Sequence, residues 1–166
     1  MATLTFGGVL MFLVTCTLQQ RREKIIGFVE SGDPAIALVL AAADFERTLR
    51  RSIIALATAP TADVRLQLER KYNTISKYGM AWNRFVEPTG KPSFVEVFPN
   101  FDNVRRAFQT RNELVHGQHG TTGINRAREQ VFVVIDATRV VTELSLKYHV
   151  DLVKKITTRR RPSARS

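Results

Sequence analysis

The stretch Arg111-Asn112-Glu113-Leu114-Val115-His116-Gly117 has the pattern of the last turns of a helix that stops at a glycine. Gly117 supplies the residue type that takes the left-handed conformation after a helix. Asn112 and His116 are four residues apart, so they lie one above the other on the helix surface. The residues leading into this end recur at the spacing of one helical face, which includes Val104, Phe108, Arg111 and Val115. The sequence thus predicts a guanidinium, an amide and an imidazole together at one helix end.

The rest of the chain has the periodicity of long amphipathic helices and no strand-period segment. The strongest helix is predicted over 34–58, followed by helices over 62–86 and 124–157. Residues 94–98 could form a helical turn or a short irregular piece. Residues 19–30 are expected to continue an apolar N-terminal helix, with Arg21, Arg22 and Lys24 facing water. Asp102 is the expected N-cap of the helix that ends at Gly117. We therefore expect an all-α fold, a bundle of about five helices.

Length and charge limit the domain organisation and the partners. The 166 residues suit one domain, which we place at 1–157, followed by a basic tail over 158–166 that is expected to be disordered. Lysine and arginine number 25 against 15 acidic residues, a net charge of +10. An excess of this size favours a polyanion, an acidic protein or an anionic membrane as partner.

The single cysteine and the apolar start of the chain bear on its location. Cys16 has no second cysteine, which excludes an internal disulfide and a cysteine-rich metal site and suits a reducing, cytoplasmic setting. The apolar run 4–18 is short and threonine-rich for a membrane span, and it lacks the features of a signal peptide. We expect a buried or subunit-facing helix there, and no membrane partner.

The helix-end motif resembles that of the HEPN superfamily (higher eukaryotes and prokaryotes nucleotide-binding). That family's signature is an arginine, four to six residues and a histidine, often with a polar residue directly after the arginine. Arg111, Asn112 and His116 match it position by position. The resemblance implies a HEPN-like helical domain, a homodimer and a metal-independent endoribonuclease that needs no cofactor. It also implies that His116 is the acid–base residue, Arg111 the phosphate clamp and Asn112 an orienting group.

These residue types suit RNA cleavage through the ribose 2′-OH. A histidine exchanges protons near neutral pH, since its reference pKa is about 6.5, and an arginine fork matches a phosphate bidentately. One histidine does not readily serve both proton transfers, and a dimer would bring a second histidine to the same cleft. Further candidates for contact with the RNA substrate are Glu46, which by the resemblance would reach the motif, and Arg47, Arg50 and the loop residue His119.

Two alternatives stay open from the sequence. An inactive nucleic-acid-binding or dimerising scaffold would pair Arg111 with Glu46 or Asp136 and use His116 only at the helix end. A metal-binding bundle could use Glu113, His116 and His119, although the second ligand set that such bundles need is absent. If the chain is a nuclease, a toxin or antiviral-defence role with an antitoxin or regulatory protein partner fits the resemblance. Gln118 stands where one family variant has a tyrosine, so regulation by tyrosine nucleotidylation is not expected.

Overall fold

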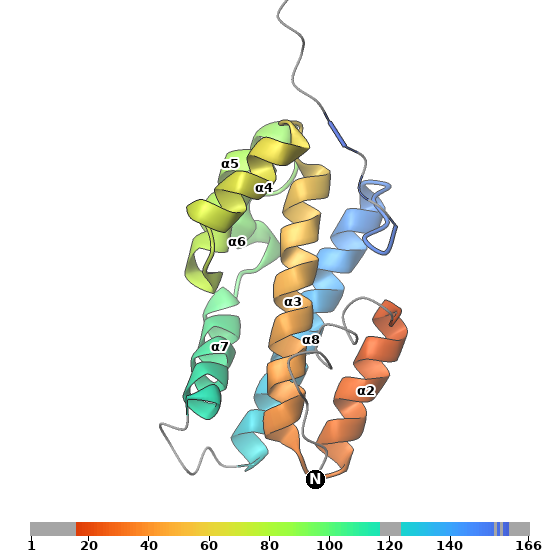
Figure 1. Cartoon of the computed structure of the whole chain (residues 1–166), viewed down its shortest axis with the longest axis vertical. Helices are drawn as coiled ribbons and strands as arrows, with labels where there is room; N and C mark the ends of the chain where they lie inside the picture. Colours follow the sequence, from red (N-terminus) through yellow and green to blue (C-terminus); the bar gives the residue numbers. More distant parts are fainter. Residues whose placement is uncertain (1–15, 117–123, 155, 157, 160–166) are drawn as a thin grey trace, which may run out of the picture. The chain divides into compact units, whose positions relative to one another are not determined.

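The computed structural model describes residues 16–116, 124–154, 156, 158 and 159, and every regular element in this part of the chain is a helix (Figure 1). This confirms the all-α prediction. None of the described helices is long and apolar enough to cross a membrane. The α-helices are α2 (Leu18–Glu30), α3 (Pro34–Leu56), α4 (Thr61–Arg70), α5 (Tyr78–Phe85), α6 (Phe94–Val97), α7 (Phe101–Val115) and α8 (Ile124–Lys147), with 3-10 turns η1 (Ile75–Lys77) and η2 (Glu87–Thr89).

The chain folds into two compact units that are discontinuous in sequence. The first unit contains residues up to 45 and residues 102–138, and the second contains 46–101 and the residues from 139 onward. Helices α3 and α8 therefore each contribute one part to each unit.

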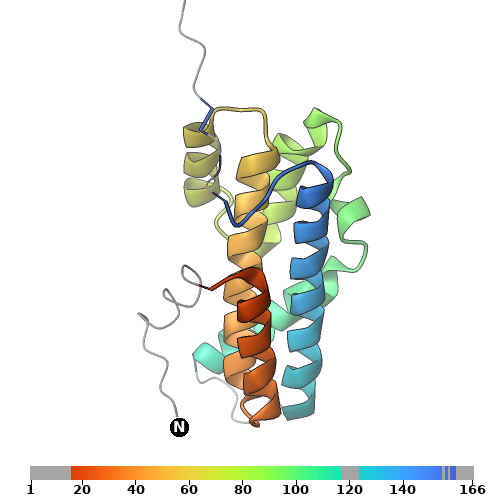
Figure 2. The same ribbon diagram turned by 90° about the vertical axis from the view of Figure 1, so that its right-hand side faces the viewer.

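In the first unit, α2 and α7 pack against the first part of α3 (Figures 1 and 2). The ring of Phe108 on α7 meets that of Phe45 on α3 edge to face, with centroids 6.1 Å apart. On the side of α2, Arg21 Nε donates to Asp44 Oδ1 at 2.6 Å, and Arg21 Nη1 donates to the carbonyl of Cys16 at 2.6 Å. The two charged side chains are only 4% and 7% exposed. The prediction that Arg21 faces water is wrong, because a buried carboxylate on α3 pairs with it.

Helix starts in the first unit differ from the predicted ones. Thr17 caps α2 in a capping box with Gln20, in which each side chain accepts from the other residue's backbone N–H. A helix therefore begins at Leu18 instead of continuing the apolar run, whose residues 1–15 lie outside the described part. Helix α7 begins at Phe101, which puts Asp102 in the first turn and not at the N-cap.

The second unit is more broken than its periodicity predicts. The expected helix over 62–86 is divided because the amides of Lys71 and Tyr72 both donate to the Gln67 carbonyl, which ends α4. Helix α8 ends at Lys147, ten residues early: the backbone of His149 is left-handed, with φ of 58°, and the amide of residue 150 turns back to the Ser145 carbonyl. The apolar period continues past both ends, so it could not reveal them.

The segment after α8 crosses over the end of α3 toward α4 (Figure 2). Arg51 donates from its guanidinium to the carbonyls of Leu152 and Lys154 at 2.8 and 2.6 Å. Arg159 donates to carbonyls at the end of α3 and just after it, those of Ile54, Ala55 and Ala59, and burial lowers the pKa of its guanidinium. Its own backbone pairs with Thr61. Residues 160–166 of the predicted tail lie outside the described part.

We expect the Arg21–Asp44 pair to be essential to the first unit. Asp44→Ala should lower the free energy of unfolding by about 3–5 kcal/mol, because it leaves the buried Arg21 guanidinium without its counter-charge. Urea denaturation followed by circular dichroism measures this loss. Glu30→Ala removes an exposed acidic residue of α2 and is the matched control; equal losses in the two variants would contradict the importance of the pair.

Candidate functional site

The Arg111–His116 motif lies at the end of α7, as predicted. The helix runs to Val115, and the amide of His116 still donates to the Asn112 carbonyl at 3.0 Å. Arg111 Nη1 donates to the Asn112 side-chain oxygen at 2.9 Å. Arg111 Nε is buried and has no hydrogen-bond partner among the described residues. The motif therefore contains a guanidinium that one neutral amide orients and whose donor capacity is not fully used.

The residues of this helix face differ in their exposure to solvent. Val104 and Phe108 are buried, whereas Arg111 is half-buried. Val115 shares the predicted helical face with them, but it is 54% exposed. Asn112 and His116 are exposed as well. The last turn of α7 thus extends beyond the apolar packing, which leaves the imidazole accessible to a substrate.

Gln130 on α8 is a residue of the first unit that the sequence analysis missed. Its Oε1 is buried without a hydrogen-bond partner among the described residues, a state it shares there only with Arg111 Nε. A buried polar atom without a hydrogen-bond partner costs about 1–3 kcal/mol of stability. The available signal was position, because Gln130 lies three residues after buried Ala127 and four before buried Val134.

Glu46 and Arg50 meet a tyrosine of the second unit. The Tyr78 hydroxyl on α5 donates to Glu46 Oε1 at 2.8 Å. Burial raises the pKa of the Tyr78 hydroxyl, and the Glu46 carboxylate raises it further, while the Arg50 guanidinium acts in the opposite direction. The structure brings these two predicted substrate contacts together. Arg47 is half-buried and has interaction partners of its own, and His119 lies outside the described residues.

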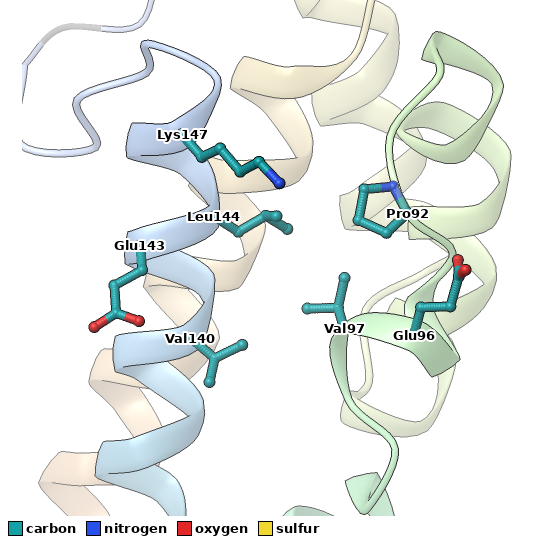
Figure 3. Close-up of a pocket in the computed structure, with 7 residues that line it drawn as sticks. All are labelled: Pro92, Glu96, Val97, Val140, Glu143, Leu144 and Lys147. Carbon is teal, nitrogen blue, oxygen red and sulfur yellow. The ribbon is translucent and has the colours of Figure 1, made fainter.

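The second unit also has a groove between α8 and the segment around α6 (Figure 3). Its volume is about 340 Å³, and its lining residues are Pro92, Glu96, Val97, Val140, Glu143, Leu144 and Lys147. The side chain of Lys147 points into the groove, whereas the carboxylates of Glu96 and Glu143 point away from it. Hydrogen bonds from Ser93 lower the pKa of Glu96. No residue of the predicted site lines this groove.

The described residues contain no group of three or more histidine, cysteine, aspartate or glutamate side chains that could hold a metal ion. Glu113 and His116 belong to this described part of the chain, whereas His119 does not. The metal-binding alternative therefore gains no support from this part of the chain.

The net charge is divided unequally between the units. The segments 1–45 and 102–138 carry eight basic and eight acidic residues, so the unit with the Arg111–His116 motif is neutral. The segments 46–101 and 139–166 carry 17 basic and 7 acidic residues, which is the whole excess of +10. A polyanion is therefore attracted mainly to the second unit.

Comparisons of this chain with protein-family models, with curated proteins and with solved structures find no match.

The Tyr78–Glu46 contact predicts a pH dependence of stability. Above pH of about 10, a tyrosine in the unfolded chain loses its proton, whereas folded Tyr78 keeps it because its pKa is raised. The unfolded state then binds fewer protons, so the free energy of unfolding falls as pH rises. Tyr78→Phe should remove up to about 1.4 kcal/mol per pH unit of this slope. Urea denaturation between pH 8.5 and 11 measures it, with Tyr148→Phe as control; equal slopes in both variants would contradict the assignment.

Proposed function

We propose that the protein is a metal-independent endoribonuclease of the HEPN type, with Arg111, Asn112 and His116 as its catalytic residues. The observation that carries the proposal is the state of Arg111. Its guanidinium is oriented by Asn112, its Nε has no partner among the described residues, and an exposed histidine follows five residues later at the helix end. Most buried side-chain donors that serve only packing have a hydrogen-bond partner, so the free Nε donor supports a ligand-binding role for Arg111.

The proposed reaction needs one clamp and two proton transfers. His116 takes the proton of the ribose 2′-OH, whose oxygen then attacks the neighbouring phosphorus. Arg111 stabilises the negative charge that grows on the non-bridging phosphate oxygens. The bond to the 5′-oxygen breaks, and a second histidine supplies the proton that this oxygen needs. The products carry a 2′,3′-cyclic phosphate and a 5′-hydroxyl.

The second histidine leads to the proposal of a homodimer. In a symmetric dimer, His116 of a second copy could face the first one in a shared cleft. Among its described residues the first unit exposes two large apolar side chains, Val115 and Phe132, and exposed apolar side chains favour association. A toxin or defence role in the cytoplasm, controlled by an antitoxin or regulatory protein, completes the proposal.

We expect a dimer in solution at micromolar concentration, because each copy supplies only one histidine to the motif at the end of α7. Size-exclusion chromatography with light scattering gives the mass directly. A strict monomer that nevertheless cleaves RNA would exclude the composite site.

We expect His116→Asn to abolish RNA cleavage while the fold and RNA binding persist, since the exposed imidazole contributes little to packing. His149→Asn is the matched control: His149 is exposed at the end of α8, and asparagine tolerates its left-handed backbone. The assay is cleavage of an end-labelled RNA with the termini of the products identified, in the presence and absence of EDTA.

Arg111→Lys serves as the second arm of this test. A lysine keeps the positive charge but not the bidentate fork, so cleavage should fall sharply while RNA binding changes little. Activity that survives His116→Asn, or that is lost with EDTA, would contradict the mechanism and favour the non-catalytic scaffold.

A further inference from the structure

Helices α4 and α5 and the segment between them carry a group of exposed cations that have no carboxylate partner among the described residues. Five basic side chains between residues 61 and 85 are exposed and form no ion pair among the described residues: Arg65, Arg70, Lys71, Lys77 and Arg84. The same stretch has only two acidic residues, Asp63 and Glu69. By contrast, Arg139 and Lys154, also in the second unit, are bound to nearby carboxylates. Part of the charge excess of the second unit is therefore concentrated here and left uncompensated.

Two of these cations lie over aromatic rings that touch one another. Lys71 Nζ is 5.4 Å from the centroid of the Tyr72 ring, and Arg84 Cζ is 5.6 Å from that of Phe85. The Tyr72 and Phe85 rings meet edge to face, at 6.2 Å and 88°. Tyr72 is 3% exposed, so the rings belong to the packing that joins the end of α4 to α5. We call the two cations Lys71 and Arg84, together with the Tyr72 and Phe85 rings that they lie over, the ring-backed cation pair.

An aromatic ring holds a cation in a different way from a carboxylate. The ring attracts the cation through its quadrupole and packs against its apolar stem, but it does not cancel the positive charge. A guanidinium on a ring face also keeps the N–H donors along its edge free for a bidentate acceptor. Lys71 and Arg84 are thus positioned by the fold while their charges remain available to a ligand.

We propose that the ring-backed cation pair, flanked by Arg70 and Lys77, binds the phosphate backbone of RNA. The proposal rests on the proposed function, since it assigns the surface that holds the substrate of that nuclease. It places this surface on residues of the second unit other than Glu46, Arg47 and Arg50.

The same geometry determines the kind of recognition. The rings already carry their own cations, and Tyr72 is buried, so bases have no free aromatic face on which to stack. Contacts from lysine and arginine to phosphates position a nucleic acid without reading its sequence. Binding should therefore depend on salt and be nearly independent of base composition.

The test measures binding of a fluorescein-labelled single-stranded RNA to the full chain carrying His116→Asn, so that the RNA stays intact. Addition of Lys71→Gln and Arg84→Gln should weaken binding about tenfold or more at low salt and make the salt dependence shallower, by about 1.4 in the log–log slope for two lost phosphate contacts. The matched control, Arg22→Gln with Arg106→Gln, removes two exposed charges from the first unit that form no ion pair among the described residues, and it should leave both quantities nearly unchanged.

Several outcomes would overturn the proposal. An equal loss in the two double variants would mean that net charge alone acts, and no loss in either would mean that RNA binds elsewhere. Polyglutamate that displaces RNA at equal charge concentration would indicate an acidic protein as the partner. Should the first variant fold poorly by circular dichroism, Arg70→Gln with Lys77→Gln tests the flanking cations without changing the residues on the rings.

This binding test is separable from the cleavage test. If the Lys71 and Arg84 variant loses binding while the otherwise unchanged chain cleaves no RNA, the binding surface stands and the proposed nuclease fails. If the chain cleaves RNA in a His116-dependent manner but binding ignores Lys71 and Arg84, the nuclease stands and this surface is excluded.

Discussion

Helix α3 has no exposed residue along its whole length, and the rest of the structure has to satisfy that burial. Its apolar residues only need neighbours to pack against. Its charged residues need partners of opposite polarity, because a buried charge without one is costly. Asp44 finds Arg21 on α2, Glu46 finds the Tyr78 hydroxyl on α5, and the Arg51 guanidinium binds backbone carbonyls of the C-terminal segment. Each unit thus contributes side chains or backbone that a buried or half-buried charged residue of α3 requires.

This dependence explains which parts of the fold could be predicted from sequence. The period of α3 and the end of α7 are local signals, since they rest on side-chain spacing and on the position of Gly117. The burial of Arg21 is not local, because it depends on a carboxylate 23 residues away in the chain. The same holds for Arg159, which satisfies carbonyls about a hundred residues earlier. Both arginines look like ordinary surface residues until the fold supplies their partners.

The candidate site likewise has features that residue spacing predicted and features that depend on the fold. The spacing of residues alone predicted that Arg111, Asn112 and His116 lie at one helix end. The hydrogen bond from Arg111 to Asn112 is also local, because the two residues are adjacent in sequence. Spacing could not show that Arg111 Nε and Gln130 Oε1 are buried without partners, because burial at those atoms depends on how α7 and α8 are covered. It also gave no reason to connect Glu46 with Tyr78, which lies 32 residues away on another helix.

The distribution of charge gives the proposed nuclease a physical division of labour. The unit that holds the motif has no net charge, so its net charge does not attract a polyanion. Attraction to the second unit would raise the local concentration of RNA without committing Arg111 to ground-state binding. Only interactions that strengthen in the transition state accelerate a reaction. An arginine that is not needed to bind RNA in the ground state can act mainly on the negative charge that develops during cleavage. Under the proposed function, separating capture from chemistry leaves the single guanidinium of the motif free for the chemical step.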